Sequence, residues 1–130
     1  MFQPEPGATL LFPSGTAHDR RRNHLSVLMT DASGPGRQVL MVPICTLHTY
    51  SDTTCIVRAD AHKFLQYDSF VAYRYSRLEF VDRLIRGIES CELIEKDRID
   101  HTIFADIRQG FDRSKFVGRF ARDFLTQYGF

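Results

Sequence analysis

The feature that most constrains this fold is an unbroken run of six apolar residues, 39–44, inside the segment 38–46. The run contains β-branched side chains and is too short to span a bilayer or to form a long core helix. It therefore predicts a strand that is buried on both faces. Hydroxyl and imidazole side chains follow at residues 45–52. A buried strand with such an end can hold reactive groups rigidly at a surface, although the alternative is an ordinary polar loop.

A second apolar segment, residues 25–30, precedes this strand and is separated from it by the sequence Asp-Ala-Ser-Gly-Pro-Gly at 31–36. Glycine and proline in such a cluster are typical of a turn. The sequence therefore predicts a hairpin in which residues 24–30 pair with residues 37–45. In that hairpin His24 and Thr46 lie at the same end, opposite the turn.

The remaining segments predict a mainly β domain with a helical C-terminus. Further strands are expected at residues 9–12, 54–58 and 69–75. Residues 77–80 either continue the last strand or lead into a helix over 81–88. Two stripes at four-residue spacing predict C-terminal helices that pack on the sheet: Ile99, Ile103 and Ile107, then Phe116, Phe120 and Phe124. Gly110 is expected to end the first of these helices.

The element order favours one domain over residues 1–130, a small antiparallel sheet or barrel with helices packed on it. The chain has 130 residues, is 43% hydrophobic and carries a net charge of +1, which excludes a uniformly basic nucleic-acid-binding coat. Three cysteines without a C-x-x-C spacing predict neither a disulfide framework nor a zinc ribbon. We expect no cofactor and no metal, because a zinc site built from His48, Asp52, Cys55 and His62 matches no common spacing.

The N-terminus has no basic region followed by an apolar one, so no signal peptide is predicted. No apolar run approaches the length of a membrane span. We therefore expect a cytoplasmic protein without a membrane partner.

The most basic stretch is residues 16–24, where Arg20, Arg21 and Arg22 stand between His18 and His24. Guanidinium groups suit bidentate phosphate contacts. The stretch is either an anion-binding loop or a solvated one.

Several of these segments together resemble the MazF/PemK family of toxin ribonucleases from type II toxin–antitoxin systems. Residues 7–12 stand where the first strand of that family begins, and residues 24–29 where its second strand follows an Arg-Pro. Residues 42–46, Val-Pro-Ile-Cys-Thr, are similar to the Pro-Ile-Thr type of motif at the end of its third strand, and residues 68–79 resemble the family's later stretch that leads to an Arg-Thr-Ile-Asp tail. The resemblance implies an SH3-like barrel with helices packed on it, endoribonuclease activity, a homodimer and a cognate antitoxin.

The chain departs from the family pattern at two places. His24-Leu25 replaces the Arg-Pro, so the arginine that the family uses against the scissile phosphate is absent there, and Arg22 lies two residues away. Ala72 and Arg74 stand where some members carry an Arg and an Asp in the late strand. These departures leave open a non-catalytic protein of the same fold, which binds nucleic acid or a protein partner, for example as an antitoxin or immunity-type partner.

The residues allow RNA cleavage without a metal, a reaction that needs a base, an acid and cations around the phosphorane. Histidine performs acid and base work near neutral pH. The expected catalytic residues are His24, Thr46 and His18. The expected residues that bind single-stranded RNA are Arg20, Arg21, Arg22, His62, Tyr73 and Arg74. For His24 and His18 the alternative is a structural or exposed loop histidine.

Overall fold

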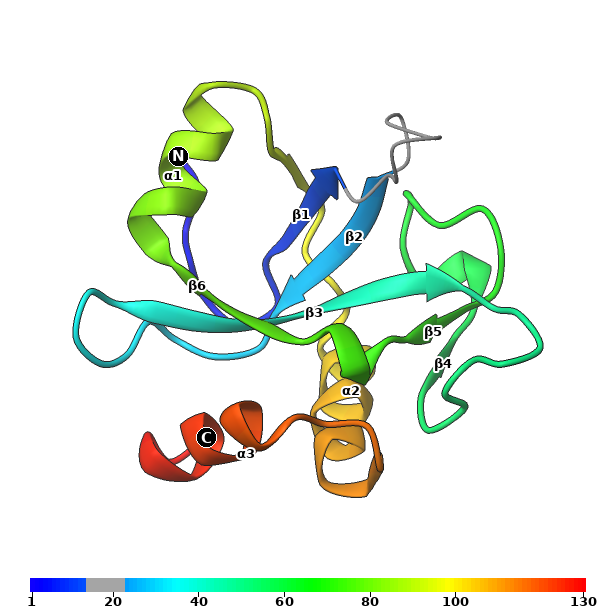
Figure 1. The fold of residues 1–130 in the computed structure, drawn as a ribbon. Coiled ribbons are helices and arrows are strands. Elements are labelled where there is room, and N and C mark those ends of the chain that lie inside the picture. The colour runs from blue at the N-terminus through cyan, green and yellow to red at the C-terminus, as the bar shows by residue number, and fades with distance from the viewer. Residues whose placement is uncertain (14–22) are drawn as a thin grey trace.

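The computed structural model describes residues 1–13 and 23–130 of the chain. Within these residues seven strands form one sheet, and three α-helices and two short 3-10 helices accompany it (Figure 1). The strands are β1 (Thr9–Pro13), β2 (Asn23–Leu28), β3 (Gln38–Thr46), β4 (Ile56–Val57), β5 (Ser69–Val71), β6 (Arg77–Phe80) and β7 (Ile94–Lys96). The helices are η1 (Ala59–Ala61), η2 (Tyr73–Tyr75), α1 (Val81–Glu89), α2 (His101–Arg113) and α3 (Arg119–Gln127).

Strand β3 lies at the centre of the sheet and has partners along both edges. One edge pairs with β2, from Leu25 opposite Ile44 to Leu28 opposite Met41, which confirms the predicted hairpin. The other edge is shared, because residues 38–41 pair with β6 and residues 44–46 pair with β5. The turn at 31–36 closes the hairpin with Gly34 and Gly36 at φ values of 76°, a conformation that suits glycine.

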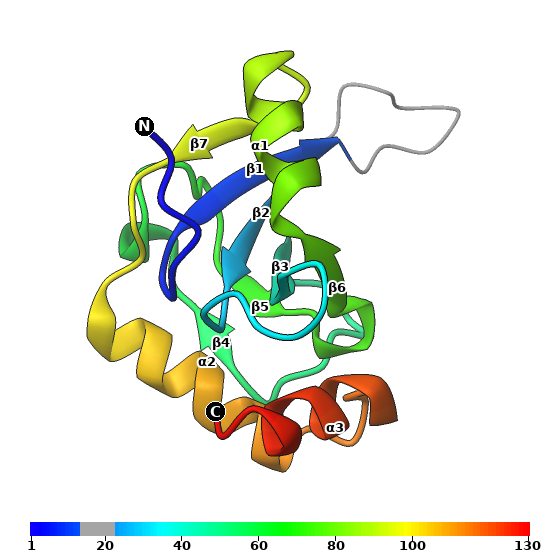
Figure 2. The same cartoon turned by 90° about the vertical axis from the view of Figure 1, so that its left-hand side faces the viewer.

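Both faces of β3 are buried, as the apolar run predicts. Leu40, Val42 and Ile44 belong to a cluster that also contains residues of α2 and α3. Val39 and Met41 alternate with them and belong to a second cluster with residues of α1. Figure 2 shows the same arrangement, with α1 on one side of the sheet and α2 and α3 on the other. A strand needs apolar side chains at consecutive positions when both of its faces are covered.

The sheet is mainly antiparallel and is not closed. Its order is β4-β5-β3-β2-β1-β7, with β6 joined to β3, and β4 and β7 form the two ends. The outer strand β7 pairs with β1 across a long sequence distance, with Thr9 opposite Lys96. The expected mainly β fold with C-terminal helices is therefore confirmed, whereas closure into an SH3-like barrel is not.

The helical region differs from the expected one at two places. Gly110 does not end α2 but lies inside it, where a Cβ atom would overlap the hydroxyl group of Tyr73. Phe116 and Phe120 are 44% and 46% exposed, so of that aromatic stripe only Phe124 is buried.

None of the described helices has the length and apolar character needed to cross a bilayer.

The contact between Gly110 and Tyr73 predicts a strong and specific effect on stability. We expect Gly110→Ala to lower the free energy of unfolding by about 1–3 kcal/mol or more, since the added methyl group overpacks a closed core. Tyr73→Phe removes the hydrogen bond from the Tyr73 hydroxyl to the carbonyl of Ile107 and is expected to cost about 1 kcal/mol alone. Urea unfolding of both single variants and the double variant measures their coupling. Strictly additive losses would contradict a direct contact.

Candidate functional site

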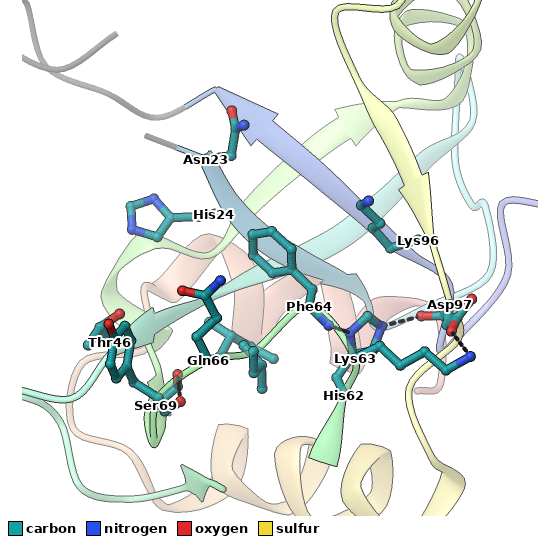
Figure 3. Close-up of a pocket in the computed structure, with 13 residues that line it drawn as sticks. Asn23, His24, Thr46, His62, Lys63, Phe64, Gln66, Ser69, Lys96 and Asp97 are labelled. Atoms are coloured by element: carbon teal, nitrogen blue, oxygen red, sulfur yellow. Dashed lines mark hydrogen bonds and ion pairs between the residues drawn. The ribbon is translucent and has the colours of Figure 1, made fainter. Parts of the chain in front are cut away.

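A pocket of about 720 Å³ opens at the end of the β2–β3 hairpin that lies away from the turn (Figure 3). The segment 62–67, which leads from η1 towards β5, covers one side of it, and Lys96 and Asp97 at the end of β7 also line it. The lining residues are Asn23, His24, Ile44, Thr46, His62, Lys63, Phe64, Leu65, Gln66, Tyr67, Ser69, Lys96 and Asp97. Three residues expected at the site, His24, Thr46 and His62, therefore line one pocket.

His24 and Thr46 come from neighbouring strands, as the hairpin predicts. The pairing of β2 with β3 runs from Leu28 opposite Met41 to Leu25 opposite Ile44, so His24 and Thr46 each follow just beyond its last pair. On its other side His24 stands opposite Phe12 of β1. His24 is half-buried at the rim of the pocket, and Thr46 is exposed.

His62 has a structural role that its sequence position does not reveal. Its Nδ1 accepts a hydrogen bond from the backbone N–H of Phe64 at 3.0 Å, and its Nε2 lies 2.6 Å from the carbonyl oxygen of Asp97. A backbone N–H can only donate, so Nδ1 carries no proton and Nε2 donates to the carbonyl. The ring is buried and ties the segment 62–67 to the end of β7 (Figure 3). Neither ring nitrogen is left for a substrate.

The charged groups of the pocket come from segments that are distant in the sequence. Lys63 forms an exposed ion pair with Asp97 at 3.3 Å. Lys96 is the last residue of the edge strand β7, and no carboxylate of the described residues forms an ion pair with it. In Figure 3, His24 and Thr46 lie at one end of the pocket, and His62, Lys63 and Asp97 lie at the other. The pocket therefore combines an imidazole, hydroxyl groups and a net positive charge.

Two further residues expected to bind substrate are placed elsewhere. Tyr73 is fully buried, donates a hydrogen bond to the carbonyl of Ile107 and packs edge-on against Phe111, and burial raises the pKa of its phenol. No face of its ring is exposed for a base to stack on. The expectation that Tyr73 binds RNA is therefore wrong. Arg74 is exposed, and its guanidinium lies 4.7 Å from the centre of the Phe116 ring, away from the pocket.

The remaining expected site residues, His18, Arg20, Arg21 and Arg22, lie outside the described residues. In the described part of the chain no three His, Cys, Asp or Glu side chains are grouped as metal ligands. Sequence reasoning missed Asn23, Phe64, Gln66, Ser69 and Lys96. No motif in the sequence marks any of these five residues.

The loop that leaves β3 after Thr46 is attached to the C-terminal helices by Asp52. Its carboxylate accepts hydrogen bonds from the hydroxyl group of Ser114 at 2.7 Å and from the backbone and hydroxyl groups of Thr54. Desolvation raises the pKa of Asp52, but the hydrogen bonds from Ser114 and Thr54 outweigh it, so the pKa lies below its ordinary value. The ionised form of Asp52 therefore stabilises the fold.

This attachment predicts an acid-dependent loss of stability. Because the pKa of Asp52 is lower in the folded than in the unfolded protein, its contribution is present above about pH 4 and is lost as the pH falls further. We expect Asp52→Asn to lower the free energy of unfolding at pH 7 and to flatten its decline between about pH 5 and 2. Urea unfolding across this range measures the decline. The exposed Asp31→Asn serves as the control, and an equal flattening in both variants would contradict the prediction.

Comparison of the sequence with family models and with curated proteins gives no match.

Proposed function

We propose that the protein is a toxin-type endoribonuclease that cleaves single-stranded RNA in the cytoplasm without a metal, at the pocket beside His24 and Thr46. The observation that carries the proposal is that these two residues, from adjacent strands, line one pocket together with Ser69 and Lys96. An imidazole and a hydroxyl group held on the ends of paired strands are well placed for chemistry at a phosphate.

The proposed reaction is attack of the ribose 2′-hydroxyl on the adjacent phosphorus with loss of the 5′-oxygen. His24 transfers a proton to or from one of these oxygens, since imidazole exchanges protons near neutral pH. The Thr46 hydroxyl donates a hydrogen bond to a non-bridging phosphate oxygen, and Lys96 offsets the charge that develops there. The arginines at 20–22, which lie next to Asn23 in the sequence, are proposed as further phosphate contacts.

Aromatic side chains in the pocket wall favour an unpaired strand over a duplex as the substrate. Phe64 and Tyr67 both line the pocket, and Tyr67 is 65% exposed. Bases of single-stranded RNA stack on such rings, whereas bases inside a duplex are already stacked on each other. Gln66, an exposed lining residue, offers an amide that hydrogen-bonds base edges.

One observation favours a second candidate, a protein of this fold that binds RNA without cleaving it. A two-histidine mechanism needs two imidazoles that exchange protons with the substrate, and both nitrogens of His62 are bonded to the backbone. Cleavage therefore requires another acid or base beside His24, for which His18 is the sequence candidate.

The test is a time course of cleavage on labelled single-stranded RNA. We expect His24→Ala to slow cleavage about 10²- to 10⁴-fold while the circular dichroism spectrum is unchanged. Thr46→Val, which keeps the side-chain shape, should slow it less. A chelator should leave the rate of the wild type unchanged.

His101→Ala is the matched control, because the side chain of His101 is 93% exposed and lies on α2 outside the pocket. Equal rates for His24→Ala and His101→Ala would refute the assignment of His24. A wild type that binds RNA and does not cleave it would establish the second candidate.

We propose in addition that the chain forms a homodimer and binds a cognate antitoxin. Phe116 and Phe120 support this assembly, because they leave apolar surface exposed beside α3. Light scattering at micromolar concentration should give twice the mass of one chain, and Phe120→Glu should shift the protein towards the monomer. Ile85→Glu, at an exposed position of α1, is the control. A wild type with the mass of one chain would contradict the dimer.

A further inference from the structure

A second groove, of about 380 Å³, lies between α1 and the ends of β1 and β6, and three arginines line it. Arg77 enters it from β6, and Arg83 and Arg86 enter it from α1. The carboxylates among its lining residues are those of Glu79 and Glu92, so the lining carries one net positive charge. One water molecule occupies about 30 Å³ in the liquid. The groove is many times larger than this, so a phosphate group fits in it.

Arg77 packs against an aromatic ring in this groove. Its guanidinium carbon lies 4.0 Å from the centre of the Phe12 ring, and its side chain is 45% exposed. Stacking on an aromatic face orients the guanidinium plane and leaves the N–H groups at its edge to bind an acceptor. Among the described residues, no hydrogen bond that uses these N–H groups is found.

The protein neutralises the positive charge of the Arg77 guanidinium only in part. The buried carboxylate of Glu79 lies 3.6 Å from Arg77 Nε and 3.9 Å from Arg83, both beyond the usual range of about 2.7–3.2 Å for a hydrogen bond. The single carboxylate of Glu79 thus forms ion pairs with two guanidinium groups. Burial lowers the pKa of Arg77, Glu79 opposes this effect, and Arg83 adds to it. An additional anion would stabilise the charged form of Arg77.

The groove is close to the proposed reaction site. Phe12 stands directly opposite His24 in the β1–β2 register. Directly opposed residues of antiparallel strands have Cβ atoms about 4.5–5.5 Å apart and project from the same face of the sheet. The Phe12 ring therefore has the side chain of His24 as its cross-strand neighbour and the guanidinium of Arg77 packed on it.

We propose that Arg77 and Arg83 form a phosphate-binding subsite for the RNA backbone next to His24. The proposal rests on the proposed function, since it takes the bound polymer to be RNA. Two guanidinium groups that share one carboxylate, with one of them held against an aromatic ring, present a fork that binds two phosphate oxygens. Glu79 positions the fork and does not contact the substrate.

The first arm of the test detects the subsite without RNA. Uniformly ¹⁵N-labelled protein is titrated with inorganic phosphate, and the Nε–H signals of its arginines are followed by NMR. We expect the signals of Arg77 and Arg83 to shift with saturation, and that of Arg119, whose side chain is 93% exposed on α3, to remain in place. Absent shifts, or equal shifts at Arg119, would overturn the proposal.

The second arm measures the binding of a fluorescent single-stranded RNA at several salt concentrations. Arg83 is 76% exposed, so Arg83→Ala should leave the fold intact and weaken binding about three- to fivefold. It should also reduce the slope of log affinity against log salt by about 0.7, the value of one phosphate contact on a single strand. Arg77→Lys keeps the positive charge beside Glu79 but removes the guanidinium N–H groups that bind two phosphate oxygens at once. It should therefore weaken RNA binding about tenfold. Arg119→Ala is the control for net charge.

The two arms separate the subsite from the proposed function. Phosphate shifts at Arg77 and Arg83 together with weaker RNA binding by Arg83→Ala support the subsite. Phosphate shifts with equal RNA binding by Arg83→Ala and Arg119→Ala overturn its assignment to RNA. A wild type that binds no RNA but shows the phosphate shifts refutes the proposed function and leaves an anion site in the groove.

Discussion

The structure depends on a strand that is paired along both edges and covered on both faces. Each backbone amide and carbonyl of a strand is a strong hydrogen-bonding group that must be satisfied when it is buried. Strand β3 meets this requirement by pairing with β2 along one edge and with β5 and β6 along the other. Its alternating side chains then anchor two separate hydrophobic clusters. The register on β3 positions β2, β5 and β6, and β1 and β4 pair in turn with β2 and β5.

The elements that follow from local chemistry were predictable from the sequence. The hairpin required only two apolar segments and a turn with glycines at positive φ, and the structure has both. The role of Gly110 was not predictable, because a glycine that ends a helix and a glycine that admits a buried tyrosine look the same in one sequence. The strand expected at residues 69–75 ends at Val71, and residues 73–75 form the 3-10 helix η2. The sequence does not reveal this end, because the aromatic residues of η2 are equally typical of strands.

The candidate site was predictable to the extent that it depends on the hairpin. His24 and Thr46 meet at one pocket because the register brings their strand ends together. The immobilised ring of His62 and the lysine at position 96 depend on β7, which joins the sheet from far along the chain. No local pattern contains that information. Tyr73 was misassigned for a related reason, since an aromatic residue near a strand end suits a core as well as a base.

The pairing of the first strand with the last one has a consequence for biosynthesis. The outer edge of β1 is completed by Thr9 opposite Lys96, and the Thr9 hydroxyl bonds to the carbonyl of Asp97, 88 residues later. At about 5–20 residues per second, a ribosome needs roughly 4 to 18 s to make that interval. During this time β1 presents unpaired backbone groups, which are a template for pairing with another nascent chain. The pocket wall formed by Lys96 and Asp97 is also absent then, so a partly synthesised chain lacks the complete pocket.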